Sequence, residues 1–387
     1  MSSPRRLHVF LLIDALGWRY LNGCEFLDDL LTFRKPLRTV LGFSSGAIPT
    51  ILTGRSPAVT GHWNLFYYDP KGSPFRWLRH CSFLPERMLN HRVTRKLFKE
   101  MGRHLFGMGK DFECSVSPRL MPWFNFVEQR NIYDRKGITG ARSIFDELSE
   151  SGISYRVYSY HDATDREIFT LAKHDIDTSD ASFFFVYLSE MDLFLHIHCR
   201  DRKAWHQRLA WYESHLRQLF GAAQNTDPKF TFTVFSDHGM TLVREHYDLG
   251  KEVEALGFSM PTDYLAIYDS TMARFWFSSE RCRTTVTEFL RSLACGDILP
   301  DHELRELGIL FPDRRYGELI FLLHPGGLIS SSDFNGPAWM PAGMHGYHPN
   351  DSYSDAIFLS NKDWPFEMRT VADVYTSMME AIGKAAC

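Results

Sequence analysis

The 387-residue chain has few features of a secreted, membrane-spanning or nucleic-acid-binding protein. Its seven cysteines are odd in number, scattered and without a CxxC pair, which excludes a disulfide framework and a thiolate zinc site. The formal net charge of −4 is too small to favour a nucleic-acid polymer or a membrane surface as partner. No apolar run approaches the roughly 20 residues that a membrane span needs. These absences predict a cytoplasmic protein.

The amino terminus, MSSPRRLHVFLLIDALGW, superficially resembles a signal peptide because two arginines precede an apolar run. That run covers only residues 7–13, and Asp14 stands where a small-residue cleavage site would be expected. A short, continuous apolar run is typical of a strand that is covered on both faces in a mostly parallel sheet. We therefore interpret it as the first core strand.

Aromatic residues are abundant, at 14% of the chain, and an apolar fraction of 44% is enough for a large core. Runs typical of strands alternate with segments of helical periodicity, which predicts an α/β fold: a doubly wound, mostly parallel sheet with helices on both faces. The expected strands are residues 7–13, 37–40, 155–158, 182–188, 230–235 and 356–360. The expected helices are residues 24–33, 47–52, 141–149, 196–222 and 370–382.

One catalytic domain is expected over residues 1–387, with two segments that interrupt the alternation. Residues 66–134 interleave aromatic and basic side chains without a strand–helix pattern, which predicts an inserted lid region. Residues 261–334 have a second, smaller α+β pattern and are expected to form a subdomain.

Six side chains of metal-binding type lie after expected strands or in a glycine-flanked turn. They are Asp14, Asp192, His196, Asp237, His238 and His345. Open α/β sheets bind ligands outside the carboxyl ends of their strands, so these side chains are expected to meet there. Asp192 and His196 are four residues apart and would share one face of a helix.

Each of these residues alone has an ordinary structural interpretation. An aspartate after a strand often caps a helix, and a histidine is often a hydrogen-bonded structural residue. Together, three carboxylates and three imidazoles are the donors that a pair of divalent ions would use, with zinc preferred and manganese as the alternative. A single ion would leave surplus charge in the site.

The segment LGFSSGAIPTILTG supplies a nucleophile for such a centre. Ser44 or Ser45, at the start of a helix beside Gly46, would direct its oxygen at the metals while free backbone N–H groups hold a phosphate oxygen. The alternative is that the serine only caps the helix.

In type and order these motifs resemble those of the alkaline phosphatase superfamily, most closely its nucleotide pyrophosphatase/phosphodiesterase-like (type I phosphodiesterase) branch. DLFLH is similar to the family's Asp-x-x-x-His, SDHGM to its Asp-His-Gly and GMHGY to its Gly-x-His-Gly. The resemblance runs from residue 14 to 348 and implies an alkaline phosphatase-like fold. It assigns one metal to Asp192, His196 and His345, and the other to Asp14, Asp237 and His238, with the Ser44 oxygen between them.

The branch places its nucleophile ten residues before the glycine of a TG step, and Gly54 then indicates Ser44, with Ser45 as the alternative. The branch commonly has Thr-Phe-Pro-Asn at this point, so SSGA departs from its pattern. Its phosphate-binding Asn corresponds to Asn64 in GHWNLF, one residue away from the family's spacing.

The resemblance implies a hydrolase that uses two divalent metal ions and a phosphoseryl intermediate to cleave a phosphodiester or pyrophosphate bond of a small-molecule phosphate ester. The alternatives are a phosphomonoesterase or phosphoryl-transfer mutase on the same scaffold, and a non-catalytic metal- and phosphate-binding pseudoenzyme. Monoesters carry one more charge and usually need an extra cation or an arginine over the terminal oxygens. The sequence has no clear third metal site in the core, which favours diesters. A pseudoenzyme usually lacks one or two metal ligands, whereas all six ligand positions carry suitable residues here, which favours an enzyme.

The insertion is expected to grip the substrate or to pack on the core as a lid with a solvated basic face. Its candidate substrate contacts are Arg76, Trp77, Arg79, Arg92, Trp123 and Phe124.

Overall fold

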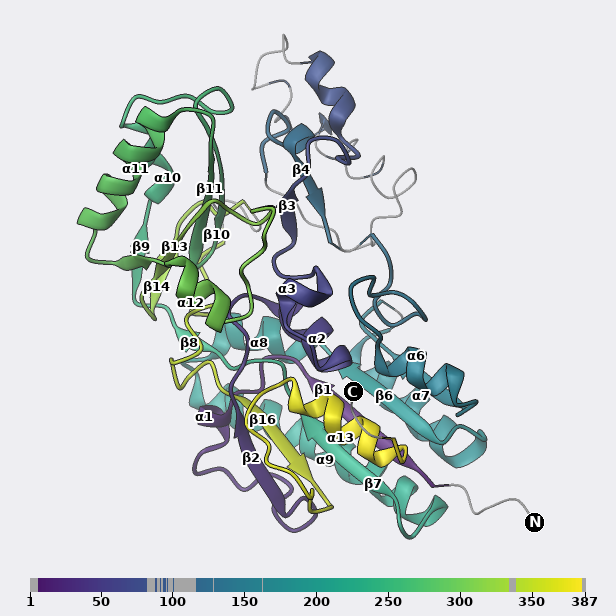
Figure 1. The fold of residues 1–387 in the computed structure, drawn as a ribbon. Helices are drawn as coiled ribbons and strands as arrows, with labels where there is room; N and C mark the ends of the chain where they lie inside the picture. The colour runs from purple at the N-terminus through teal and green to yellow at the C-terminus, as the bar shows by residue number, and fades with distance from the viewer. Residues whose placement is uncertain are drawn as a thin grey trace.

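The computed structural model describes residues 6–384 apart from 82–87, 89, 90, 92, 95, 97–99, 101–115, 128, 162 and 334–338. Its centre is a six-stranded sheet in the order β2-β16-β7-β1-β6-β5 (Figure 1). These strands are β1 (His8–Ile13), β2 (Phe33–Leu37), β5 (Tyr155–Tyr158), β6 (Phe183–Leu188), β7 (Thr231–Phe235) and β16 (Ala356–Ser360). β1 pairs in parallel with β6 and β7, and β5 with β6, whereas β16 is antiparallel to β7 and β2.

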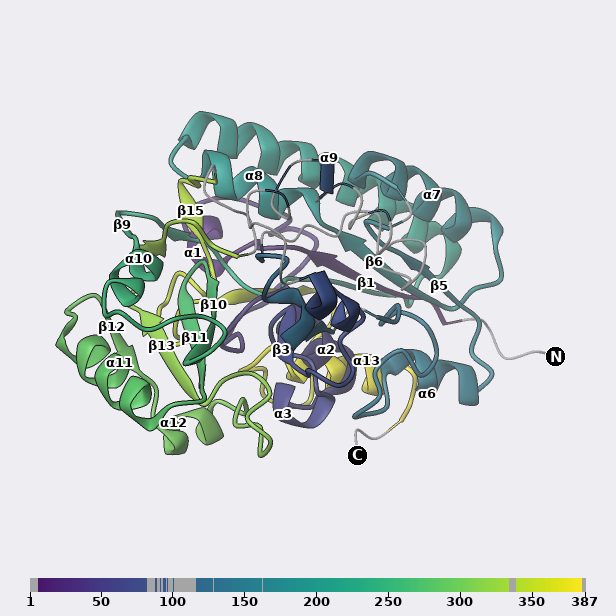
Figure 2. The same ribbon diagram turned by 90° about the horizontal axis from the view of Figure 1, so that it is seen from above.

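Helices cover both faces of this sheet, so the residues of its central strands β1, β6 and β7 are buried throughout (Figure 2). One face carries α7 (Asp165–Thr178), α8 (Glu190–His198) and α9 (Arg202–Thr226). The other carries α2 (Ser44–Thr53), α6 (Ile144–Glu150) and α13 (Asp373–Ala381). The predicted doubly wound, mostly parallel α/β fold is confirmed.

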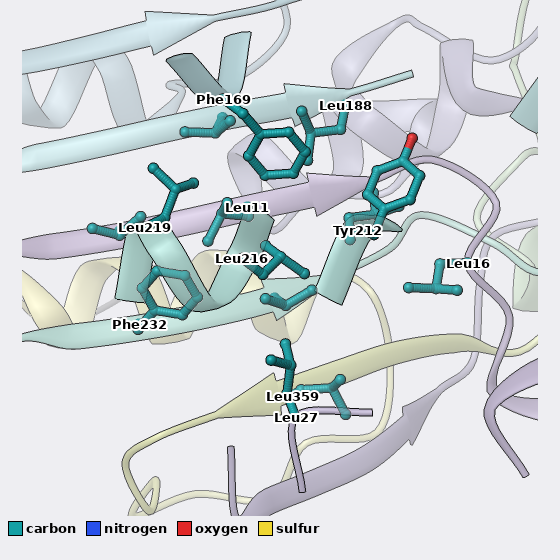
Figure 3. Close-up of a cluster of buried hydrophobic side chains, with 14 of the residues drawn as sticks. Leu11, Leu16, Leu27, Phe169, Leu188, Tyr212, Leu216, Leu219, Phe232 and Leu359 are labelled. Carbon is teal, nitrogen blue, oxygen red and sulfur yellow. The ribbon is translucent and has the colours of Figure 1, made fainter. Parts of the chain in front are cut away.

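A hydrophobic cluster lies on each face of the sheet. On the first face, Leu11 of β1 and Phe232 of β7 pack with Phe169 of α7 and with Leu216 of α9 (Figure 3). On the second face, strand phenylalanines such as Phe185 pack with residues of α2, α6 and α13. Burial of these side chains on both faces stabilises the strands whose carboxyl ends form the candidate site.

A smaller antiparallel sheet with the order β10-β11-β13-β12 lies beside the main one. Its strands are β10 (Tyr264–Asp269), β11 (Met272–Phe277), β12 (Gly296–Ile298) and β13 (Leu319–Leu323), accompanied by helices α10 (Leu249–Glu254), α11 (Glu280–Ser292) and α12 (Asp301–Glu306). Three strand pairs complete the fold: β3 (Phe66–Tyr68) with β4 (Phe124–Phe126), β8 (Thr241–Leu242) with β15 (Gly343–Met344), and β9 (Glu245–Tyr247) with β14 (Gly327–Ile329). Further short helices in the part of the chain that the structure describes are α1 (Trp18–Leu21), α3 (Pro57–Thr60), η1 (Arg76–Cys81) and η2 (Met121–Trp123).

The predicted helix at residues 24–33 and the strand at 37–40 are wrong. The structure has turns after α1, and β2 begins at Phe33. Leu27 adopts a left-handed backbone with φ of 55°, and the Asp28 carboxylate accepts a hydrogen bond from the Phe26 N–H, a local bond that competes with a helix. The apolar residues in this segment pack into the core from a turn.

The predicted single helix at residues 196–222 is also wrong, because the chain forms two helices, α8 and α9. α8 ends at His198, and the Asp201 side chain accepts a hydrogen bond from the Ala204 N–H and so caps the start of α9. Asp192 and His196 therefore lie on a short helix of their own. Within the described residues, no helix is both long and apolar enough to cross a bilayer.

Candidate metal centre

The carboxyl ends of β1, β6 and β7 meet at one edge of the main sheet. The register aligns Ile13 with Leu188 and Leu12 with Phe235, so the residues that follow the three strands emerge side by side. Asp14 follows β1, Asp237 and His238 follow β7, and α8 begins two residues after β6. The edge predicted from the sequence thus gathers residues from three distant parts of the chain.

Asp14, Asp237 and His238 form a buried cluster whose donor atoms lie within 4.8 Å of one another. Nε2 of His238 is 3.2 Å from Oδ2 of Asp237 and 3.5 Å from Oδ1 of Asp14. The same nitrogen lies 3.0 Å from Oγ of Ser44. Four oxygen and nitrogen donors therefore surround one small volume.

Asp192, His196 and His345 form a second cluster with the same 4.8 Å limit between donor atoms. Nε2 of His196 lies 3.3 Å from Oδ2 of Asp192, and Nε2 of His345 lies 3.5 Å from the other oxygen of that carboxylate. The Asp192 side chain is 25% exposed, so solvent reaches this side of the centre.

A short strand pair joins the two clusters. β8, which begins three residues after His238, pairs with β15, which ends just before His345. The imidazole rings of His238 and His345 consequently stack with their centroids 3.8 Å apart. The GMHGY motif, which contains His345, therefore packs against the SDHGM motif, which contains His238.

Hydrogen bonds fix the orientation of the histidine ligand candidates. Nδ1 of His238 donates to the Gly239 carbonyl at 2.9 Å, and Nδ1 of His196 donates to the Gly343 carbonyl at 2.8 Å. Each bond places the proton on Nδ1 and leaves the Nε2 lone pair facing its cluster.

Two further contacts hold Asp14 and Asp237 in place, and neither was predicted from the sequence. The Tyr187 hydroxyl, near the end of β6, donates a hydrogen bond to Oδ2 of Asp14. The Thr39 hydroxyl donates to the Asp237 carbonyl oxygen at 2.6 Å. In the sequence SFFFVYL, Tyr187 looks like another aromatic residue of the core. Its position next to the end of β6 is the one sequence feature that could have indicated a contact with the site.

The electrostatics of the two clusters differ. Burial, reinforced by the charges of Asp237 and Asp192, raises the pKa of Asp14 well above its usual range. Burial also works against ionisation of Asp192, but the nearby imidazoles of His196 and His345 outweigh it and lower the pKa of that carboxyl. Burial lowers the pKa of His345 well below its ordinary value, and the neighbouring His238 adds to the effect.

These donors fit divalent cations. Oδ1 of Asp14, Oδ2 of Asp237, Oδ1 of Asp192 and Nδ1 of His345 are buried and have no hydrogen-bond partner among the described residues. Three carboxylates packed this closely in a poorly solvated site repel one another unless protons or cations compensate them. Mixed carboxylate and imidazole ligation is typical of zinc.

Ser44 and Ser45 differ clearly in their contacts. Ser44 is the first residue of α2, and the capping position belongs to Phe43, so Ser44 does not serve as the N-cap. The Ser45 hydroxyl donates to the Trp63 carbonyl at 2.7 Å, which turns it away from the clusters. Ser44, in contrast, points at His238.

Asn64 forms its hydrogen bonds with residues other than the six ligand candidates. Its side chain is fully buried, its amide nitrogen lies 3.5 Å from Oδ2 of Asp269 and 3.3 Å from the sulfur of Met272, and its Oδ1 has no hydrogen-bond partner among the described residues. A Cβ on Gly42 would sit 3.2 Å from that oxygen, so Asn64 adjoins the loop that leads to Ser44. Among the described residues, the hydrogen bonds of its amide go to Asp269 and Met272 and to neither cluster.

Described residues of the insertion contact one another. The Arg79 guanidinium lies 4.4 Å from the centre of the Trp123 ring and donates to the Pro70 and Pro122 carbonyls. Phe124 packs into a hydrophobic cluster with Trp276 of the smaller sheet. These contacts favour the packed-lid interpretation. Arg92 lies outside the described residues.

Comparison with known proteins agrees with this geometry. The sequence model of the type I phosphodiesterase / nucleotide pyrophosphatase family matches residues 8–348, a span that includes both clusters and Ser44. The chain belongs to this family. Membership places it among the phosphoester hydrolases, as the sequence motifs indicated. A search of curated proteins found no match to the chain.

Several solved structures have the same fold as this chain, at low sequence identity to it. Murine ectonucleotide pyrophosphatase/phosphodiesterase 5, as an inactive variant in complex with AMP, superposes with a TM-score of 0.69 at 15% identity, covering 99% of this chain and 96% of that one. The human protein of the same name gives 0.70 at 13% with the same coverage. Phosphonoacetate hydrolase from Sinorhizobium meliloti 1021, in complex with phosphonoformate, gives 0.68 at 13%, again covering 99% and 96%.

Proposed function

We propose that this protein hydrolyses a phosphodiester or pyrophosphate bond in a small-molecule substrate, with two divalent metal ions and with Ser44 as the nucleophile. The observation that carries the proposal is the position of the Ser44 hydroxyl, 3.0 Å from His238 in a cluster of buried carboxylates. A hydroxyl at the start of a helix that is directed at such a cluster, instead of at its own helix end, is placed for attack on a bound phosphorus.

Two sets of residues would hold the ions. Asp14, Asp237 and His238 would bind one, and Asp192, His196 and His345 would bind the other. The Ser44 oxygen lies 3.0 Å from a nitrogen of the first set. Bound zinc or manganese would lower the pKa of the serine hydroxyl and neutralise charge on the departing oxygen. The stacked rings of His238 and His345 hold the two sets against each other.

The chain's own groups then act in two steps. Ser44 Oγ gives up its proton to solvent and attacks phosphorus, the bond from phosphorus to the leaving oxygen breaks, and that oxygen takes up a proton from solvent. The resulting phosphoseryl intermediate keeps the substrate's other ester group on phosphorus. Water next attacks that phosphorus, the bond to Ser44 Oγ breaks, and the serine regains a proton. The backbone N–H groups at the start of α2 lie where they would hold a non-bridging phosphate oxygen. Asn64 is a further candidate for this role.

The structural neighbours support a small substrate. One is a nucleotide pyrophosphatase/phosphodiesterase bound to AMP, and the other a hydrolase bound to phosphonoformate. For this chain we propose a nucleotide or activated-sugar diester as the substrate class, and zinc as the native metal.

The test is turnover of bis-p-nitrophenyl phosphate and of p-nitrophenyl phosphate after the purified protein is loaded with zinc or manganese. Faster diester cleavage is expected. Acid quenching during diester turnover should trap a p-nitrophenyl phosphoryl group on the peptide that contains Ser44, which mass spectrometry detects. A large preference for the monoester would reverse the substrate assignment. Metal-loaded protein that cleaves neither ester, nor a nucleotide diester or pyrophosphate, would indicate a non-catalytic binding protein.

A further inference from the structure

The first turns of α7 and α8 cap each other. Oδ1 of Asp165, the first residue of α7, accepts a hydrogen bond from the Ser189 N–H at 3.0 Å, and its Oδ2 accepts one from the Glu190 N–H at 3.3 Å. In return, Oε1 of Glu190, the first residue of α8, accepts a hydrogen bond from the Asp165 N–H at 3.2 Å. Backbone N–H groups that would lack helical partners are satisfied between the two helices.

α9 holds this reciprocal cap in place. The Tyr212 hydroxyl donates to Oδ2 of Asp165, whose side chain is buried, and Arg208 forms an ion pair with Glu190 at 3.0 Å. The Arg208 guanidinium also lies 5.0 Å from the centre of the Tyr212 ring. Two negative side chains at helix N-termini are favoured electrostatically, and the positive charge of Arg208 compensates their closeness.

The capped helix α8 carries Asp192 and His196. At nine residues it is shorter than a helix that is stable in isolation, so its position depends on contacts at its ends. At the far end, the His196 carbonyl accepts from the Ala342 N–H at 2.7 Å, and the His196 ring donates to the Gly343 carbonyl. At the near end, the Asp165 carboxylate receives the two backbone N–H groups of Ser189 and Glu190, just ahead of Asp192.

We propose that Asp165 is a positioning residue for the metal site formed by Asp192, His196 and His345, which it contacts only through the backbone of α8. The inference rests on the proposed function, since it requires that this cluster binds a metal ion. Loss of the cap frees the first turn of α8 and with it the direction of the Asp192 carboxylate. The cluster of Asp14, Asp237 and His238 depends on other elements and is left intact.

The experiment measures zinc binding by isothermal titration calorimetry on metal-free wild-type protein and on Asp165→Asn. The Asn oxygen can accept from one backbone N–H, but its amide nitrogen cannot accept from the second. Affinity at the site of Asp192 should fall about 10- to 100-fold, the range for residues that orient metal ligands. Affinity at the other site should not change. The variants Asp192→Ala and Asp237→Ala identify which binding event belongs to which site.

Asp146→Asn is a matched control. Asp146 is also a buried capping aspartate at the first turn of a helix, and it accepts from the N–H groups of Ser143 at 2.9 Å and Lys136 at 2.8 Å and from the Ser143 hydroxyl at 3.1 Å. It lies in α6, apart from the metal-ligand candidates. It should lose comparable thermal stability and keep wild-type affinity at both sites.

Each outcome has a distinct meaning. Wild-type zinc affinity in Asp165→Asn, or an equal loss of affinity in Asp146→Asn, would overturn the inference and leave the proposed function standing. Wild-type protein that binds no zinc would overturn both. If Asp165→Asn does not fold, Tyr212→Phe decides, because it removes only the hydroxyl that holds Asp165. A smaller loss of affinity at the same site is expected, and unchanged affinity would contradict the inference.

Discussion

The hydroxyl oxygen of Ser44 lies 3.0 Å from Nε2 of His238, although the two residues are 194 positions apart in the chain. The contact exists because α2 begins, and β7 ends, at the same edge of the main sheet. The neighbouring Ser45 hydroxyl is bound to the Trp63 carbonyl instead. The two adjacent serines thus have different contacts, and substitutions can distinguish their roles.

Replacement of Ser44 by Ala should reduce kcat for a diester substrate at least about 1,000-fold, because it removes the hydroxyl that lies beside His238 and that we propose as the nucleophile. Ser45→Ala removes one hydrogen bond to Trp63 and should keep activity within a factor of about ten of the wild-type value. Steady-state kinetics on metal-loaded protein check both variants. The reverse pattern, with Ser45→Ala inactive and Ser44→Ala active, would identify Ser45 as the nucleophile and keep the enzyme assignment.

Alanine at one ligand position should empty one metal site. Asp237→Ala and His345→Ala each remove a donor from a different cluster, so each should lose one of two bound ions and most of the activity. Elemental analysis of protein dialysed against dilute zinc measures the stoichiometry. His324→Ala is a suitable control, since His324 is exposed and pairs with Asp297 on the small sheet. Full metal content in both ligand variants would contradict the two-metal assignment.

The convergence of the six ligand candidates could be predicted from the sequence because each follows a recognisable feature. Strand ends mark Asp14, Asp237 and His238, and the i,i+4 spacing of Asp192 and His196 needs only one turn of helix to share a face. The position of His345 was harder to predict, since it depends on the pairing of two-residue strands β8 and β15. No local pattern of two residues specifies such a pairing. The glycine-flanked turn marked His345 as a candidate ligand, and the resemblance to a family assigned it to the same metal as Asp192 and His196.

Contacts that depend on packing between distant segments were not predictable. Asp165 is the first residue of α7, a helix that was not predicted from the sequence, and its carboxylate accepts hydrogen bonds from the start of the neighbouring helix α8. The break between α8 and α9 was missed because the apolar periodicity continues through it, while the single cap at Asp201 decides the outcome. The hydrogen bond of the Asp201 cap therefore determined where α9 begins, although the apolar periodicity predicted one continuous helix.

His8 gives a prediction on pH dependence that is independent of the metal centre. Burial, with smaller effects from Lys362 and Arg6, lowers its pKa from 6.5 to about 4 in the folded protein. A lowered pKa means that the neutral ring is favoured by folding, so its contribution is present above pH 6.5 and is lost as the pH falls toward 4. The wild type should lose about 3 kcal/mol more than His8→Gln between pH 7 and 4. Urea unfolding of metal-free protein at several pH values tests this, and parallel pH profiles would contradict it.

Arg274 links the small sheet to the segment that holds Asn64, and its loss should be costly. The fully buried guanidinium donates to Oδ2 of Asp269 at 2.6 Å and to the Phe66 carbonyl at 2.8 Å. Arg274→Met fills the space but leaves the buried Asp269 carboxylate without its cation, which should lower the free energy of unfolding by about 3–5 kcal/mol.

The control is Arg217→Met, which removes the exposed ion pair to Asp29 and should have little effect on urea unfolding. Equal losses in the two variants would show that the buried pair is no more important than a surface one. A large loss in Arg274→Met alone, relieved by Asp269→Asn in the double variant, would show that the unpaired carboxylate is the cause.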